Sequence, residues 1–177
     1  RHTDGAYQEA QTLTGHSDWV RALALDPATQ TLFSGSGDHT IKVWRHTDGA
    51  YQEAQTLTGH SDAVLALALD PASRTLFSGS GDATIKVWRH TDGAYQEAQT
   101  LTGHSDSVWA LALDPASQTL FSGSGDATIK VWRSTDGAYQ EAQTLTGHSS
   151  SVFALALDPA SQTLFSGSAD ATIKVWR

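Results

Sequence analysis

A histidine, a serine and an aspartate recur together in four near-identical stretches of the chain. In the first stretch they are His16, Ser34 and Asp38. These are the residue types of a hydrolase triad, in which the histidine takes a proton from the serine and the aspartate orients the histidine. An enzyme of this kind needs one active site, however, and the sequence repeats the same set four times. We therefore expect a structural role for these residues and no enzymatic activity.

Metal and cofactor sites find little support in the sequence. His2, His46 and His90 occur once per copy, and Ser134 takes their place in the last copy. Zinc needs several ligands within about 2–2.1 Å of one ion, and residues spaced one per repeat do not converge. We interpret these histidines as solvated turn residues. The chain has no cysteine and no phosphate-cradling glycine motif, so we expect no metal and no cofactor.

The composition is that of a globular protein with an acidic balance. The 177 residues are 39% hydrophobic and 17% charged, with a formal net charge of -8 and eleven Lys and Arg spread along the chain. Nucleic acids and anionic membranes both favour a concentrated basic face, so we expect neither as a partner. No apolar run approaches the roughly 20 residues of a transmembrane helix, and we expect a cytoplasmic protein. The chain has no methionine, which indicates a trimmed chain or a piece of a longer array.

An internal repeat accounts for the whole chain. A Gly-His pair recurs every 44 residues, at positions 15–16, 59–60, 103–104 and 147–148, and the tryptophan of "IKVW" keeps the same step. A fixed period in this range is typical of propellers and solenoids. We therefore expect one repeat array over residues 1–177, with copies at 1–44, 45–88, 89–132 and 133–177.

Each copy predicts four short antiparallel strands. "VRALALD" is an apolar run, "TLFSGS" and "TIKVW" are rich in β-forming residues, and "QEAQTLT" alternates well enough for a half-exposed outer strand. "DPATQ", "GD" and "TDGAY" separate these segments and are typical turn sequences. Such a sheet would leave apolar faces in water if it stood alone, and stacking the copies side by side buries them. The fold class is therefore all-β.

The Gly-His pair, the "SGSxD" segment and "IKVW" at this spacing resemble the WD40 repeat of β-propellers. The resemblance covers the full length and implies a propeller with four four-stranded antiparallel blades per chain. One departure is clear, because the Trp-Asp pair of the family reads Trp-Arg here. The family's aspartate lies at a strand end, so we expect little structural cost from the arginines at Arg45, Arg89, Arg133 and Arg177.

The resemblance also implies a role for the recurring polar residues. In the family, the histidine, a serine of the second strand, the aspartate of the next turn and the tryptophan form a buried hydrogen-bond chain. Gly37 becomes Ala169 in the last copy, so this turn position does not demand positive φ, and the aspartate side chain holds the turn. The residues expected in the chain are His16, Ser34, Asp38, Trp44, His60, Ser78, Asp82, Trp88, His104, Ser122, Asp126, Trp132, His148, Ser166, Asp170 and Trp176.

Two columns of the repeat differ strongly between copies: the first is Trp19, Ala63, Ser107 and Ser151, and the second is Arg21, Leu65, Trp109 and Phe153. A third column changes once, from His39 in the first copy to Ala83, Ala127 and Ala171 in the others. In the family these columns lie on one face, around the mouth of the central channel. Drift after duplication would also change the "DPASQ" and "TDGAY" turns, which barely vary. The replacements include residue types that commonly anchor interfaces. We therefore predict partner binding by Trp19, Arg21, His39, Ala63, Leu65, Ser107, Trp109, Ser151 and Phe153.

The function follows from this surface and from the resemblance. WD-repeat proteins are usually non-catalytic platforms, so we predict a scaffold that binds a protein or peptide through the varied residues. One alternative is a structural, engineered or recently amplified repeat unit without a ligand. Another is a lectin-like site for a small ligand in the channel mouth.

The order of the strands predicts an assembly. The chain opens with the outermost strand of a blade, Gln8 to Thr14, and ends at the third strand of its fourth blade. An exposed unpaired edge favours pairing, so the two ends should meet. Closure within one chain would need four blades at about 90° each, whereas two chains give eight blades at about 45°. We predict a homodimer that exchanges N-terminal strands in one eight-bladed ring, with an open piece of a longer array as the alternative.

Overall fold

The computed structural model describes residues 7–177, and this part of the chain is all-β. It forms four antiparallel sheets, of which three have four strands and the last has three. The strands are β1 (Val20–Asp26), β2 (Thr31–Ser36), β3 (Ile41–Thr47), β4 (Ala50–Leu57), β5 (Val64–Asp70), β6 (Thr75–Ser80), β7 (Ile85–Thr91), β8 (Ala94–Leu101), β9 (Val108–Asp114), β10 (Thr119–Ser124), β11 (Ile129–Thr135), β12 (Ala138–Leu145), β13 (Val152–Asp158), β14 (Thr163–Ser168) and β15 (Ile173–Trp176). We call the sheets blades 1 to 4 in chain order.

Local turn chemistry explains why the strands reverse where they do. Asp48 and Gly49 join β3 to β4 with φ of 53° and 84°, the positive values that a type I′ hairpin turn requires. Asp26 ends β1, and its carboxylate accepts hydrogen bonds from the Ala28 N–H at 3.0 Å and the Thr29 hydroxyl at 2.6 Å. The same turns recur in the following copies, so each blade is a meander of consecutive strands.

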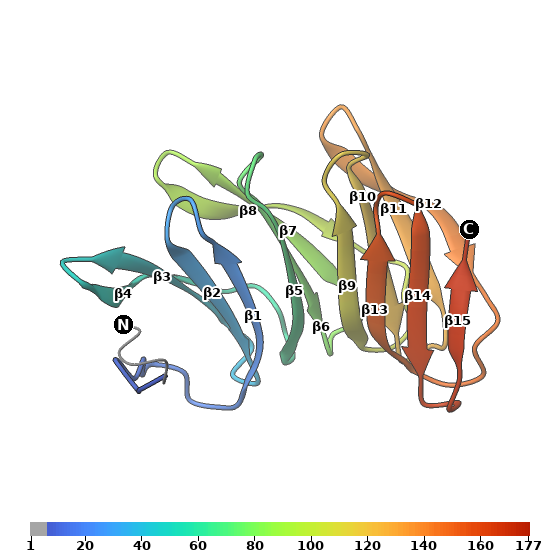
Figure 1. The fold of residues 1–177 in the computed structure, drawn as a ribbon, viewed down its shortest axis with the longest axis horizontal. Helices are drawn as coiled ribbons and strands as arrows, with labels where there is room; N and C mark the ends of the chain where they lie inside the picture. Colours follow the sequence, from blue (N-terminus) through green and yellow to red (C-terminus); the bar gives the residue numbers. More distant parts are fainter. Residues whose placement is uncertain (1–6) are drawn as a thin grey trace.

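The hydrophobic core lies between consecutive blades. The first strands of the blades (β1, β5, β9 and β13) contact one another in order, and the later strands of each blade lie progressively further out (Figure 1). Phe33 of blade 1 meets Tyr95 of blade 2 edge to face at 5.0 Å, and Phe77 repeats this contact with Tyr139. Each interface is therefore built from two different faces of neighbouring blades.

The N-terminal segment differs from the prediction. Gln8 to Thr14 were expected to form a strand, but residues 7–19 contain none. The strand to which this segment would pair is the third strand of a preceding blade, and residues 7–177 form no such blade. The segment nevertheless contacts blade 1, because Gln11 binds the Tyr51 backbone through both side-chain atoms of its amide.

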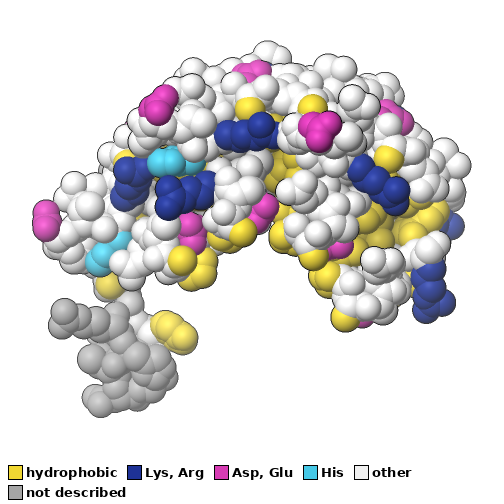
Figure 2. Space-filling view, turned by 90° about the horizontal axis from the view of Figure 1, so that it is seen from above, with side chains coloured by type: hydrophobic (Ala, Val, Ile, Leu, Met, Phe, Trp, Pro, Cys, Tyr) yellow, Lys and Arg dark blue, Asp and Glu magenta, His cyan; other side chains and the backbone are white. Residues whose placement is uncertain are grey.

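The four blades form an open arch (Figure 2). The blade that carries β1 and the blade that carries β15 lie at its opposite ends (Figure 1). Residues 7–177 contain no helix that is long and apolar enough to cross a membrane. The arch ends in two blade faces that no other blade covers.

Candidate recognition surface at the channel mouth

The second varied column occupies a β-bulge in the first strand of every blade. The register of β1 against β2 shifts between Val20 and Ala22, so Arg21 is the extra residue. Leu65, Trp109 and Phe153 hold the same place in β5, β9 and β13. A bulge turns a side chain away from the regular alternation of the strand. The bulge thus takes the side chains of this column out of the regular alternation of the first strand.

The first and third columns lie at the same end of the blade. The Gly37 N–H donates to the Trp19 carbonyl at 2.8 Å, which ties the segment before β1 to the turn between β2 and β3. That turn carries His39 with φ of 68°, and its counterparts Ala83, Ala127 and Ala171 have φ of 63–66°. The three columns together therefore form one surface, which we call the variable face.

Side chains of the variable face contact one another. The Arg21 guanidinium lies 4.9 Å from the centroid of the Trp19 ring, a cation–π distance. Trp109 and Phe153 meet edge to face at 5.2 Å across the boundary between blades 3 and 4. Of the nine predicted residues, four are exposed: Trp19, Arg21, His39 and Phe153. The other five are half-buried: Ala63, Leu65, Ser107, Trp109 and Ser151.

Another varied pair beside this surface was missed by sequence reasoning. A Cβ on Gly81 would lie 2.9–3.1 Å from the carboxylate of Asp62, and the other glycines of this column meet their aspartates in the same way. In blade 4 the glycine is Ala169 and the aspartate is Ser150. The larger residue thus occurs only where the smaller partner makes room. Gly37 and Gly81 do not have positive φ, in agreement with the reasoning from Ala169.

The structure joins the predicted polar residues into one hydrogen-bond chain per blade. In blade 2 the Trp88 indole donates to the Ser78 hydroxyl at 2.9 Å, and the His60 Nε2 lies 2.7 Å from that hydroxyl. The His60 Nδ1 lies 2.7 Å from the Asp82 carboxylate, whose other oxygen accepts from the Thr84 hydroxyl at 2.6 Å. The same contacts occur in blades 1, 3 and 4 at similar distances.

This order of atoms matches a hydrolase triad, but the serine is not placed for attack. Ser78 is fully buried, and its hydroxyl oxygen already accepts the Trp88 N–H while its proton points to His60. A nucleophile needs an exposed oxygen and a site for the carbonyl carbon beside it. The hydrogen-bond chain instead links the second strand, the third strand and two turns of one blade, and it therefore stabilises the blade.

The charges along this chain are fixed by burial and hydrogen bonding. Burial lowers the pKa of His60 and outweighs the hydrogen bond to Asp82, which raises it, so the ring is neutral at pH 7. Burial raises the pKa of Asp82, but hydrogen bonds from Thr84 and His60 outweigh this effect and lower the pKa to about 2. A neutral imidazole therefore donates to an ionised carboxylate.

The arginine that replaces the family's aspartate bridges consecutive blades. The Arg45 Nη2 donates to the Gly93 carbonyl at 3.1 Å and lies 3.2 Å from the His90 Nε2, and Arg89 donates to the Gly137 carbonyl. The histidine column is also more structured than a solvated turn. His46 lies in β3, is half-buried and meets the Tyr51 ring edge to face at 5.1 Å; His2 lies outside the described residues.

A lysine–glutamate ion pair joins the third and fourth strands in each of the first three blades. Lys42 and Glu53 are 2.8 Å apart, and Lys86–Glu97 and Lys130–Glu141 repeat the ion pair. Among residues 7–177, no group of three or more His, Asp or Glu side chains is placed to hold a metal ion. The variable face presents aromatic, aliphatic and cationic side chains, namely Trp19, Arg21, Leu65, Trp109 and Phe153.

Comparison with known proteins decides the family. The family described as WD domain, G-beta repeat matches residues 7–45, 51–89, 95–133 and 139–177. The chain belongs to the WD40 repeat family. This WD40 chain is 36% identical to the computationally designed Ika4 protein, whose crystal structure superposes with a TM-score of 0.80 over 97% of this chain and 98% of that one. The fold assigned from the sequence resemblance is thereby confirmed as a WD40 propeller fold.

Similar curated proteins match over single repeats. A probable E3 ubiquitin ligase complex SCF subunit, sconB, of Arthroderma otae is 49% identical over 21% of this chain and 6% of its own length. The nuclear distribution protein PAC1 of Scheffersomyces stipitis is 56% identical over 18% of this chain and 6% of its length, and the pre-mRNA-splicing factor prp46 of Emericella nidulans is 47% identical over 19% and 8%. The chain thus matches less than a tenth of the length of these relatives.

Proposed function

We propose that this WD40 chain is a non-catalytic scaffold that binds a protein or peptide through the variable face. One observation carries the proposal: a chain that otherwise repeats itself varies in the columns that the fold gathers at one end of the blades. The members include two tryptophans, an arginine and a phenylalanine, and these residue types are enriched among the anchors of protein interfaces, tryptophan and arginine most strongly.

The geometry favours an extended segment or a protein loop as the ligand. Leu65, Trp109 and Phe153 form an apolar row across three neighbouring blades, and Arg21 adds a cation at one end of this row. An apolar row with one cationic end suits a peptide that carries hydrophobic side chains and a carboxylate. One relative is named as a probable subunit of an E3 ubiquitin ligase complex, which agrees with a binding role.

A displayed library of random peptides, selected on the purified protein, tests this proposal. Selected peptides should lose affinity at least 30-fold in the combined variant Trp19→Ala, Trp109→Ala and Phe153→Ala, since truncating an interface anchor typically costs about 2–4 kcal/mol. The matched control changes glutamines in the turns after the first strands of blades 1 and 3, namely Gln30→Ala and Gln118→Ala, and should bind as the unmodified protein does. Peptides that bind the variable-face variant at full strength would refute the proposal.

A repeat unit without a ligand is the second candidate. The designed protein that shares 36% of its sequence and almost the full length of this chain shows that a WD40 chain of this size can arise by design. If the chain has no ligand, the residues of the varied columns were not selected for binding. The same library would then yield no peptide whose binding depends on Trp109 and Phe153.

A further inference from the structure

Blade 4 exposes a face that the other blades bury. Ile173 of β15 is 76% exposed, whereas its counterpart Ile85 in β7 is 1% exposed. Phe165 and Val175 are exposed as well, while Phe77 and Val87 at the same positions of blade 2 are fully buried. The sequence of these strands is unchanged between blades. What differs is only the absence of a following blade.

Blade 1 exposes the complementary face. Val20 is 52% exposed, but Val64, its counterpart in blade 2, is fully buried against blade 1. Leu23 and Leu25 are exposed in the same way, although Leu67 and Leu69 pack against the core between blades 1 and 2. The two ends of the arch therefore carry the two halves of the interface that holds its interior together.

The N-terminal segment already occupies the place of an outer strand. The Gln11 amide donates to the Tyr51 carbonyl at 2.7 Å and accepts from the Tyr51 N–H at 2.9 Å. Gln55 of β4 makes the same two bonds to the Tyr95 backbone in the next blade, at 2.7 and 2.9 Å. The Thr12 hydroxyl also donates to Glu9 at 2.6 Å, as a threonine of β4 does to Glu53. The segment thus lies beside blade 1 as β4 lies beside blade 2.

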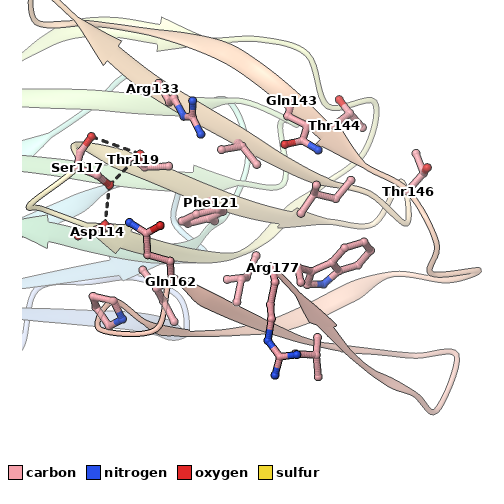
Figure 3. Close-up of a pocket in the computed structure, with 17 residues that line it drawn as sticks. Asp114, Ser117, Thr119, Phe121, Arg133, Gln143, Thr144, Thr146, Gln162 and Arg177 are labelled. Carbon is pink, nitrogen blue, oxygen red and sulfur yellow. Dashed lines mark hydrogen bonds between the residues drawn. The ribbon is translucent and has the colours of Figure 1, made fainter.

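Blade 4 has a groove where such a strand is missing. The groove has a volume of about 870 Å³ and runs between blade 3 and the edge strand β15 (Figure 3). Its lining includes Phe121, Gln143 and Trp176, with Gln143 held over the groove by β12. Gln143 belongs to the column whose earlier members bind the backbone of a tyrosine in the following outer strand. The repeat step assigns that partner to Tyr7, which is exposed in the single chain.

The charges at the two ends match as well. Lys174 of β15 is the counterpart of Lys42, which pairs with Glu53 at 2.8 Å. The counterpart of Glu53 in the N-terminal segment is Glu9, which lies 44 residues earlier in the sequence.

We propose that a second copy of this chain closes the ring. Residues 7–13 of each copy form the fourth strand of the partner's blade 4, and the two blade-1 faces cover the two blade-4 faces. A single chain cannot close a ring without a large change in the angle between its blades. A closed ring of four blades needs about 90° per blade, whereas the arch is wide open after four blades (Figure 2). Two copies related by a two-fold axis complete eight blades with contacts that the interior of each chain already makes.

Closure also completes the variable face. Neighbouring members of the bulged column touch, as Trp109 and Phe153 do at 5.2 Å. In the closed ring Phe153 of one copy becomes the neighbour of Arg21 of the other, so both junctions contribute to recognition. This inference does not rest on the proposed function, because the ring can form whether or not the face binds a partner.

The mass in solution tests the proposal directly. Light scattering at micromolar concentration should give twice the 18.8 kDa of one chain. Ile173→Asp should give the single-chain mass with unchanged circular dichroism, because that side chain is exposed in the free arch and is buried only in the ring. The matched control Gln140→Asp, on the outer strand β12, should stay dimeric. A monomeric unmodified protein, or a dimer that Ile173→Asp leaves intact, would overturn the proposal.

Strand exchange is tested by a disulfide, since the chain has no cysteine of its own. Ile41 faces Leu57 in the register of β3 against β4, so the exchanged strand should place Leu13 of one copy opposite Ile173 of the other. Two single variants, Leu13→Cys and Ile173→Cys, are mixed and oxidised. A disulfide-linked pair of different chains is expected in high yield, whereas Tyr7→Cys with Gln140→Cys serves as the control and should give little. If the double variant Leu13→Cys/Ile173→Cys closes within one chain and the mixture gives no pair, exchange is wrong.

Discussion

Replacing Asp82 by alanine should destabilise the protein, because the buried His60 Nδ1–H would lose its acceptor. The carboxylate accepts four hydrogen bonds: the His60 Nδ1 at 2.7 Å, the Ser61 N–H at 3.1 Å, the Thr84 N–H at 2.9 Å and the Thr84 hydroxyl at 2.6 Å. Water can replace the carboxylate for Ser61 and Thr84, which lie near the surface, but His60 is buried. Leaving a buried donor unpaired costs about 1–3 kcal/mol.

The pKa of Asp82 gives an independent magnitude for the same loss. Its pKa falls from 3.8 to about 2 on folding. One pKa unit corresponds to about 1.4 kcal/mol, and after allowance for partial screening by solvent the ionised carboxylate contributes about 1–2 kcal/mol. Because the folded-state pKa is the lower one, this contribution is present above pH 4 and is lost as the pH falls towards 2.

Urea unfolding followed by tryptophan fluorescence measures both effects, at one protein concentration because association adds stability. Asp82→Ala should lower the free energy of unfolding by about 1–3 kcal/mol at pH 7, and the gap to the unmodified protein should narrow between pH 4 and pH 2. Asp82→Asn keeps an acceptor for His60 and should cost less than the alanine variant. A free energy of unfolding unchanged within about 0.5 kcal/mol, or a gap that persists at pH 2, would refute the reasoning.

Three further predictions concern the turns and the buried histidines. Gly81→Ala should lower the melting temperature, because its Cβ would lie 2.9–3.1 Å from the carboxylate of Asp62, at a cost of about 1–3 kcal/mol. Adding Asp62→Ser should restore most of the lost stability. If the double variant is no more stable than Gly81→Ala alone, the coupling of the two positions is refuted. Ala83 has φ of 65°, so Ala83→Val should cost at least about 1 kcal/mol in urea unfolding while Ala83→Gly costs nothing; equal effects would contradict this. Burial lowers the pKa of His104 below its unfolded value, so the unfolded state binds the proton first and the urea midpoint should fall as the pH drops from 7 to 5; a midpoint that rises would reverse the assigned direction.

The sequence was sufficient to predict the parts of the fold that depend on contacts within one copy. The strands and the Asp-Gly turn at 48–49 follow from segments that vary little between copies. The meeting of His16, Ser34, Asp38 and Trp44 follows from the family resemblance. Hydrogen-bond complementarity limits how those side chains can be arranged, so the family resemblance could be applied residue by residue.

Contacts between copies were harder to predict. The period fixes which residue types recur but not which neighbouring copy they reach. Arg45 was therefore expected at a strand end with little structural cost, and its hydrogen bond to the Gly93 carbonyl was not predicted. The N-terminal strand was expected from its pattern, yet a strand needs a paired edge, and one chain supplies none for residues 8–14. The exchange of Gly81 and Asp62 for Ala169 and Ser150 was visible in the printed sequence as two changes in one copy.

The six tryptophans provide the most direct test of the central claim that the variable face is the recognition surface. Trp44, Trp88, Trp132 and Trp176 each donate their indole N–H to a serine of the hydrogen-bond chain, whereas Trp19 and Trp109 belong to the variable face. Nuclear magnetic resonance resolves the six indole N–H signals while a selected peptide is added. We expect the signals of Trp19 and Trp109 to shift and the other four to stay in place. Binding that shifts the four serine-bonded signals and leaves those two unchanged would contradict this claim.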